Sequence, residues 1–147
     1  MTTHWKGYVV AKDGFKVGDN ASSVEVLSGP DITNSTITVG TEASNVVNVA
    51  VQFKDAAGDN LARPVHCHLY FSDDAAGQTI ATTAITTVAV GTDGVIMEAI
   101  TAGKEYRVVS EADGAFDLDL TQAAADTLYM QIALPNELKT SSVITFT

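Results

Sequence analysis

Two alternating runs between residues 45 and 74 dominate the hydrophobic pattern of the chain. In each run, apolar side chains recur at every second position, and mostly polar ones lie between them. The recurring residues are Val47, Val49, Val51 and Phe53 in the first run and Val65, Cys67, Leu69 and Phe71 in the second. A period of two in β-branched and aromatic residues predicts strands that bury one face. Since no segment of useful length favours a helix, we expect a second sheet to cover that face.

Shorter runs of the same kind continue through the rest of the chain at a spacing typical of a β-sandwich. Further strands are expected at residues 34–39, 95–100, 105–110, 115–120 and 127–135, and in the last residues around Ile144 and Phe146. The dipeptides Asp93-Gly94 and Asp113-Gly114 separate some of these runs. Asp-Gly favours the positive φ angles of tight hairpin turns, so both dipeptides support this division into strands.

Two connecting segments have a weaker pattern. Residues 78–90 are rich in Thr and Ala, and we interpret them as an edge strand or an ordered loop. Residues 121–126 are predicted to form one helical turn with Thr121 as the N-cap, since the segment is too short for more. Polar positions inside the predicted strands, such as Asp117, Asp119 and Gln131, are expected to face solvent.

About seven or eight strands after residue 34, with no helix and no internal repeat, predict an all-β protein. We predict an immunoglobulin-like Greek-key β-sandwich, with a small β-barrel or jelly roll as the alternative. The Cys-Trp-Cys core of antibody domains is missing, because the chain has one cysteine. Residues 1–33 are assigned to an N-terminal arm or extension, and residues 34–147 to the sandwich domain.

The composition of the chain argues mainly against two kinds of partner, nucleic acids and membranes. The 147 residues suffice for one core, and the net charge of −10 reflects eight basic residues against eighteen acidic ones. Phosphate backbones attract clustered Lys and Arg, so we do not expect nucleic-acid binding. The chain also shows no apolar run that could cross a bilayer and no signal peptide, so we expect no membrane partner and synthesis in the cytoplasm.

His66 and His68 are the most plausible metal ligands, because side chains two positions apart on a strand share a face. A third ligand is not evident from the sequence, and Cys67 is expected to point into the core instead. The acidic residues Asp73, Asp74, Asp113, Asp117 and Asp119 lack the spacing of a calcium-binding loop. Nucleophile elbows and phosphate-binding loops are also missing. We therefore predict no metal, no cofactor and no enzymatic activity.

Several phrases together resemble a group of bacteriophage virion proteins with an immunoglobulin-like domain, which are described as head decoration or other structural proteins. They are STITVGTEASNVVNVAVQFKDAAG, LYFSDDAAG, GTDGVI, GKEYRVVSEADGAFDLDLT, TLYMQIALPN and the final VITFT. The resemblance covers residues 34–147. The late turn in these proteins is Leu-Pro-Asn-Gly, whereas Glu137 stands at the Gly position here.

The resemblance implies a non-enzymatic head decoration or cement protein that binds and stabilises the assembled capsid shell. It would be made in the host cytoplasm and act on the capsid surface, with the major capsid protein as partner and a homotrimer as one possible assembly. Many symmetry-related copies would make weak contacts sufficient. The alternative is a phage tail or fibre module that binds a host surface or a carbohydrate.

Candidate contact residues follow from this implied function. Aromatic side chains beside basic groups suit an interface anchor, and the first sixteen residues hold three lysines against one acid. The candidates there are Trp5, Lys6, Tyr8 and Phe15, which could instead add a strand to the protein's own sheet. On the domain, the outward row of His66, His68 and Tyr70 is a second candidate contact surface.

Overall fold

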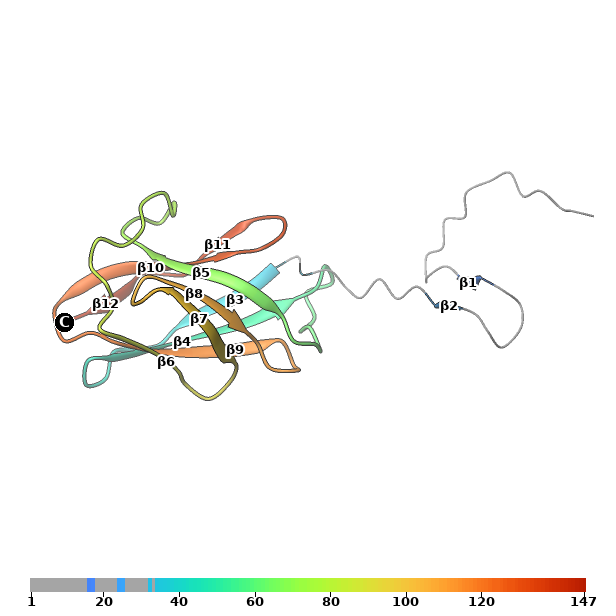
Figure 1. Cartoon of the computed structure of the whole chain (residues 1–147), viewed down its shortest axis with the longest axis horizontal. Coiled ribbons are helices and arrows are strands. Elements are labelled where there is room, and N and C mark those ends of the chain that lie inside the picture. Colours follow the sequence, from blue (N-terminus) through green and yellow to red (C-terminus); the bar gives the residue numbers. More distant parts are fainter. Residues whose placement is uncertain (1–15, 18–23, 26–31, 33) are drawn as a thin grey trace, which may run out of the picture. The chain divides into compact units, whose positions relative to one another are not determined.

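The computed structural model describes Lys16–Val17, Val24–Glu25, residue 32 and residues 34–147 of the chain (Figure 1). Two units are distinguished, Met1–Asp31 and Ile32–Thr147. In the first unit, β1 (Lys16–Val17) pairs antiparallel with β2 (Val24–Glu25).

The second unit is all-β, and its described residues contain no helix. Its strands are β3 (Asn34–Val39), β4 (Val46–Lys54), β5 (His66–Ser72), β6 (Thr87–Val90), β7 (Val95–Thr101), β8 (Glu105–Val109), β9 (Ala115–Thr121), β10 (Asp126–Ala133), β11 (Leu138–Thr140) and β12 (Ile144–Phe146). One sheet has the order β3-β4-β9-β6. The other has the order β11-β10-β5-β8-β7, with β12 also paired to β10.

Five connections cross between the sheets, those from β4 to β5, β5 to β6, β6 to β7, β8 to β9 and β9 to β10. Two of them interlock the sheets. The chain passes from β4 to β5 and again from β9 to β10, while β4 pairs with β9 and β5 pairs with β10. All strand pairs are antiparallel, and the sheets remain open instead of closing on each other. The prediction of an all-β sandwich is therefore confirmed, and the arrangement is consistent with an immunoglobulin-like fold. A closed barrel is excluded.

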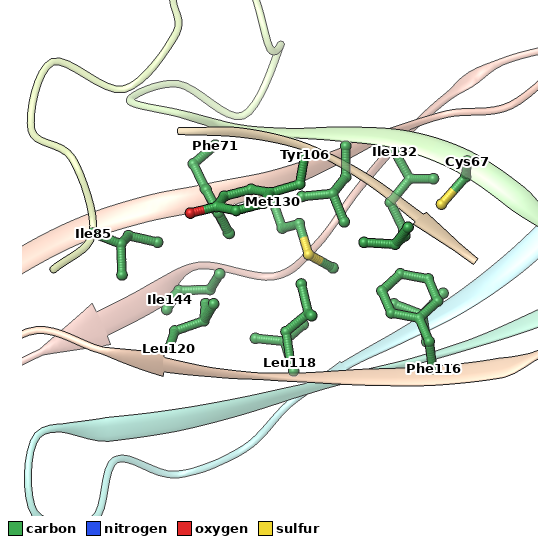
Figure 2. Packing of buried hydrophobic residues seen from close by; sticks show 14 of the residues in the cluster. Cys67, Phe71, Ile85, Tyr106, Phe116, Leu118, Leu120, Met130, Ile132 and Ile144 are labelled. Atoms are coloured by element: carbon green, nitrogen blue, oxygen red, sulfur yellow. The ribbon is translucent and has the colours of Figure 1, made fainter. Parts of the chain in front are cut away.

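The hydrophobic core fills the space between the two sheets (Figure 2). Every second residue of β4, β9 and β5 is buried, as the period of two predicts. The largest fully buried side chains are Phe53, Phe71, Phe116, Phe146, Leu61, Leu69, Leu118, Leu120, Leu128, Met130, Ile132 and Ile144. Burial of each such side chain stabilises the folded state by about 1.5–3 kcal/mol relative to leaving it exposed. The inward residues predicted from the two opening runs all belong to this core.

The two segments with weak patterns form a loop with an edge strand and a connection without a helix. Residues 78–90 contain an ordered loop that ends in the edge strand β6, so both interpretations apply in part. The predicted helical turn at 121–126 is wrong. The side chain of Gln122 is buried there, and its Oε1 accepts hydrogen bonds from Thr86 N–H at 3.1 Å and Thr86 Oγ1 at 2.6 Å. These long-range bonds hold the start of the connection, and residues 123 and 124 form bends instead of a helical turn.

The strand count also differs from the prediction, since ten strands, β3 to β12, follow residue 33. The last edge of the sheet is split into β11 and β12, which both pair with β10. Between them, the Met130 N–H donates to Ser141 Oγ at 2.9 Å, and the Ser141 N–H donates to the Met130 carbonyl at 2.9 Å. A serine hydroxyl therefore continues the ladder where the backbone register shifts.

Gln131 was expected to face solvent. Its outward direction is as predicted, but its exposure to solvent is not. It lies on the outer face of β10, but the side chain is fully buried. Gln131 Nε2 donates to Ser72 Oγ at 2.9 Å, and Gln131 Oε1 accepts from Thr140 Oγ1 at 2.7 Å. The end of β5 and strand β11 supply these partners, so a buried polar network joins β5, β10 and β11.

Candidate partner-binding surface

A groove of about 790 Å³ lies between the start of β5, the middle of β7 and the ends of β8 and β10. It is lined by Ile32, His66, Cys67, His68, Met97, Glu98, Arg107, Val108, Ala133, Leu134 and Pro135. Apolar residues form most of this lining, with a few polar groups at one side. That composition is typical of surfaces that bind an apolar group and orient it with a small number of polar contacts.

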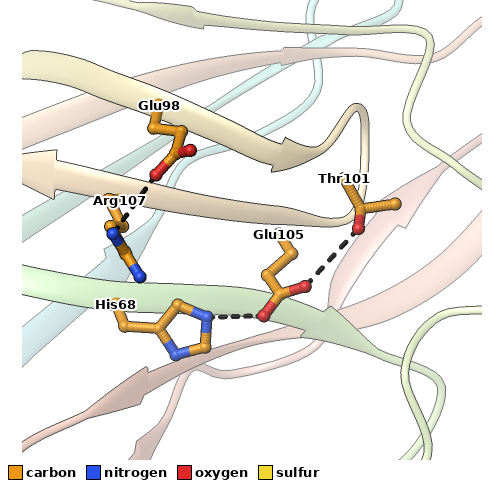
Figure 3. Close-up of polar contacts among 5 residues, drawn as sticks. All are labelled: His68, Glu98, Thr101, Glu105 and Arg107. Atoms are coloured by element: carbon orange, nitrogen blue, oxygen red, sulfur yellow. Dashed lines mark hydrogen bonds and ion pairs between the residues drawn. The ribbon is translucent and has the colours of Figure 1, made fainter.

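Three polar residues of the lining, His68, Glu98 and Arg107, take part in two pairs across neighbouring strands, one of them with Glu105 outside the lining (Figure 3). His68 Nε2 lies 2.8 Å from Glu105 Oε1, and Arg107 Nη1 lies 3.3 Å from Glu98 Oε2. The side chains of Arg107 and Glu98 are 65% and 55% exposed. An exposed ion pair contributes at most about 1 kcal/mol to stability. Arg107 and Glu98 can therefore exchange partners at little cost in free energy.

Strand β7 supplies the most exposed apolar surface near the groove. It is an edge strand that pairs only with β8 among the strands described. The register shifts between Ile96 and Glu98 and again between Ala99 and Thr101, so Met97 and Ile100 occupy the two irregular positions. Their side chains are 56% and 41% exposed. Bulges re-aim side chains, and here the first one presents Met97 to the groove.

The structure separates the predicted contact residues. His66 is exposed, His68 is half-buried, and both line the groove. Tyr70 lies outside this lining; its ring centroid is 6.1 Å from that of His68, and its hydroxyl donates to the Gly77 carbonyl at 2.7 Å. Burial, together with the charge of Asp74, raises the pKa of Tyr70. Tyr70 therefore anchors a loop.

The remaining predicted contact residues, Trp5, Lys6, Tyr8 and Phe15, lie outside the described part of the chain. Their role stays a prediction.

Acidic side chains considered as calcium ligands are engaged in holding loops. Asp73 accepts hydrogen bonds from Thr82, and Asp74 accepts them from the N–H groups of Gln78 and Thr79. The Gln78 N–H, followed by that of Thr79, lowers the pKa of Asp74 despite the opposing effect of desolvation. Within the described ranges, no group of three or more His, Cys, Asp or Glu side chains is arranged to hold a metal ion.

Asp117 was expected to be a solvent-facing acid, and this is wrong. Its side chain is buried beside the turn between β6 and β7. Oδ1 accepts the N–H groups of Thr92 and Asp93 at 2.7 Å each, and Oδ2 accepts Asn48 Nδ2 at 2.7 Å. Burial opposes ionisation, but the donors from Asp93, Asn48 and Thr92 outweigh it and lower the pKa of Asp117. The Asn48 amide also donates to Asp119 Oδ1 at 2.8 Å.

Cys67 points into the core as predicted, and burial raises the pKa of its thiol to about 12. We expect the native protein not to react with a thiol reagent such as DTNB at pH 8, where only about one thiol in ten thousand is ionised. Unfolding in urea should release one reactive thiol per chain. Absorbance at 412 nm measures both states. A fast reaction of the folded protein would contradict the buried position.

Sequence reasoning missed most of the groove. Met97, Glu98, Arg107 and the turn after β10 were not selected as contact residues. One available signal was the run from Val95 to Ile100, in which apolar residues do not alternate with polar ones. Such a run, in a strand that the fold leaves at an edge, exposes apolar side chains.

No helix in the described part of the chain is long and apolar enough to cross a membrane. Comparison with protein families, curated proteins and solved structures gives no match for this chain. The resemblance to phage virion proteins therefore stays a prediction.

Proposed function

We propose that the protein is a non-enzymatic phage structural protein that binds the assembled capsid shell and stabilises it, as a head decoration or cement protein. Its partner is the major capsid protein, and its place of action is the capsid surface. The resemblance of residues 34–147 to phage virion proteins supports a capsid protein as the partner. The observation that carries a binding role is the groove with its exposed apolar edge on β7.

The chemistry of the groove favours binding over catalysis. The contact between His68 and Glu105 is the kind of pair that could orient a general base. In nucleophilic catalysis such a base activates a side-chain nucleophile, and the lining offers only Cys67 for this role. Its thiol is buried, and its pKa of about 12 keeps it protonated near neutral pH.

Polar groups elsewhere in the domain support the same proposal. Asp117, Asp74 and Gln131 each bind groups of the protein's own loops and strands. Such bonds make a rigid domain whose surfaces keep their shape. In a homotrimer the copies are linked, so simultaneous contacts with a symmetric shell gain avidity and each copy needs only a modest affinity.

Co-sedimentation tests this proposal. Shells of the phage that encodes the protein, assembled without it, are mixed with the full-length chain and centrifuged. We expect saturable binding, with density on the outer shell in electron micrographs of the pelleted particles. A shell that sediments without the protein would contradict the proposal. Density at the tail tip of complete virions would favour the tail or fibre alternative.

A further inference from the structure

We propose that the groove beside β7 is the capsid-contacting face of the domain, and that it takes an apolar or aromatic side chain next to a Lys or Arg of the capsid protein. This inference rests on the proposed function. It adds the location of the contact and the chemistry of the bound segment.

The apolar wall sets the first requirement for the bound side chain. Ile32, Met97, Ala133, Leu134 and Pro135 present hydrocarbon surface to one open space of about 790 Å³. A space of this size lies within the range of about 300–1,000 Å³ that accommodates organic ligands. Met97 has a flexible, polarisable side chain, so it can adapt to an aromatic or aliphatic partner. It is 56% exposed in the free chain, and this surface gains from being covered.

The charges set the second requirement. Glu98 lines the groove, and Glu105 lies just beyond it, bound to His68. Glu98 pairs only with the exposed Arg107 across the strand, at 3.3 Å, among the ion pairs of the described residues. A cation from a partner can share or replace that pairing at little cost. The chain as a whole carries a net charge of −10, so long-range attraction also favours a basic partner over a second copy of the chain.

Two variants on the same strand test the inference in the full-length chain. Met97→Asp puts a charge on the apolar wall, and Ile100→Asp makes the same change at the second irregular position of β7, outside the groove. We expect Met97→Asp to weaken shell binding by at least about tenfold and Ile100→Asp by less than about threefold. Both residues are exposed, so thermal unfolding of the two variants should stay near that of wild type. Equal binding by Met97→Asp and wild type, or equal loss in both variants, would overturn the inference.

A charge variant and a small probe separate the inference from the proposed function. Glu98→Lys should weaken shell binding and reduce its salt dependence.

The dipeptide N-acetyl-tryptophanyl-lysine amide, titrated into the isotope-labelled protein, should shift NMR signals of His66, His68, Met97 and Ala133. If shells fail to bind wild type but the dipeptide still shifts these signals, the proposed function fails and the groove chemistry stands. Shifts elsewhere, or none, overturn the groove chemistry. Loss of self-association in Met97→Asp, measured by sedimentation equilibrium, would assign the groove to a second copy and also overturn it.

Discussion

Asp117→Ala is expected to lower the free energy of unfolding by about 3 kcal/mol, because it leaves three donors without their acceptor. The donors are Thr92 N–H, Asp93 N–H and Asn48 Nδ2, each 2.7 Å from the carboxylate. Asp117 lies in β9, and its bonds tie the turn between β6 and β7 to the sheet. Urea unfolding followed by circular dichroism measures the change.

Asp119→Ala is the matched control, since Asp119 lies two residues further along the same face of β9. Asp119 is only partly buried and accepts a hydrogen bond from Asn48. Its loss should cost less than about 1 kcal/mol. Similar costs for both variants would contradict the special role of Asp117.

The contribution of Asp117 is also expected to depend on pH. Its pKa is lowered in the folded protein from an ordinary value of 3.8. The stabilisation is therefore complete above that value and is lost as the pH falls through the lower pKa of the folded state. The difference in unfolding free energy between wild type and Asp117→Ala should be constant from pH 7 to 5 and shrink below pH 4. A difference that grows in acid would contradict this assignment.

Gly103→Ala is expected to destabilise the domain by about 3 kcal/mol, through unfavourable backbone geometry and crowding together. Gly103 has a φ of 73° and is buried in the turn between β7 and β8. A Cβ there would meet the carbonyl oxygen of Ile85 and lie 2.9 Å from Ala84 Cβ. The Gly103 carbonyl accepts a hydrogen bond from the Ile85 N–H at 3.0 Å, and the Gly103 N–H donates one to the Tyr106 hydroxyl at 2.6 Å. Thermal unfolding of the variant measures the loss.

Gly58→Ala separates the two causes. Gly58 also has a positive φ, 88°, but a Cβ there would have no heavy atom within 4 Å. The change should cost about 1 kcal/mol, from backbone geometry alone. If both glycine variants lose the same stability, crowding at Gly103 has no effect and this explanation fails.

Inward and outward faces were predictable because strand geometry links them directly to sequence spacing. Alternation in β4 and β5 placed Val49, Phe53, Leu69 and Phe71 in the core, and the structure buries all four. A strand that must bury one face needs a second sheet, so the sandwich also followed from the pattern. Asp-Gly turns supported the division into strands, and Gly94 and Gly114 do have positive φ angles.

Whether an outward polar residue is exposed or buried was not predictable from alternation. Asp117 and Gln131 occupy outward positions, yet neighbouring loops and strands cover them. Gln122 similarly prevents a local helical turn by bonding Thr86, 36 residues away. Each outcome depends on which distant segment packs on top, and local periodicity carries no information about that.

The sequence by itself determined the alternating faces, the all-β class and the acidic character of this protein, because these depend on composition and on neighbours two positions apart. The two histidines of the groove were also visible, since they share a strand. Only the tertiary structure decided that β7 is an edge and that His68, Met97, Arg107 and Ala133 meet around one groove. The physical reason is that strand order is set by the packing of the whole core, which brings together residues as far apart in the chain as His68 and Ala133, 65 positions.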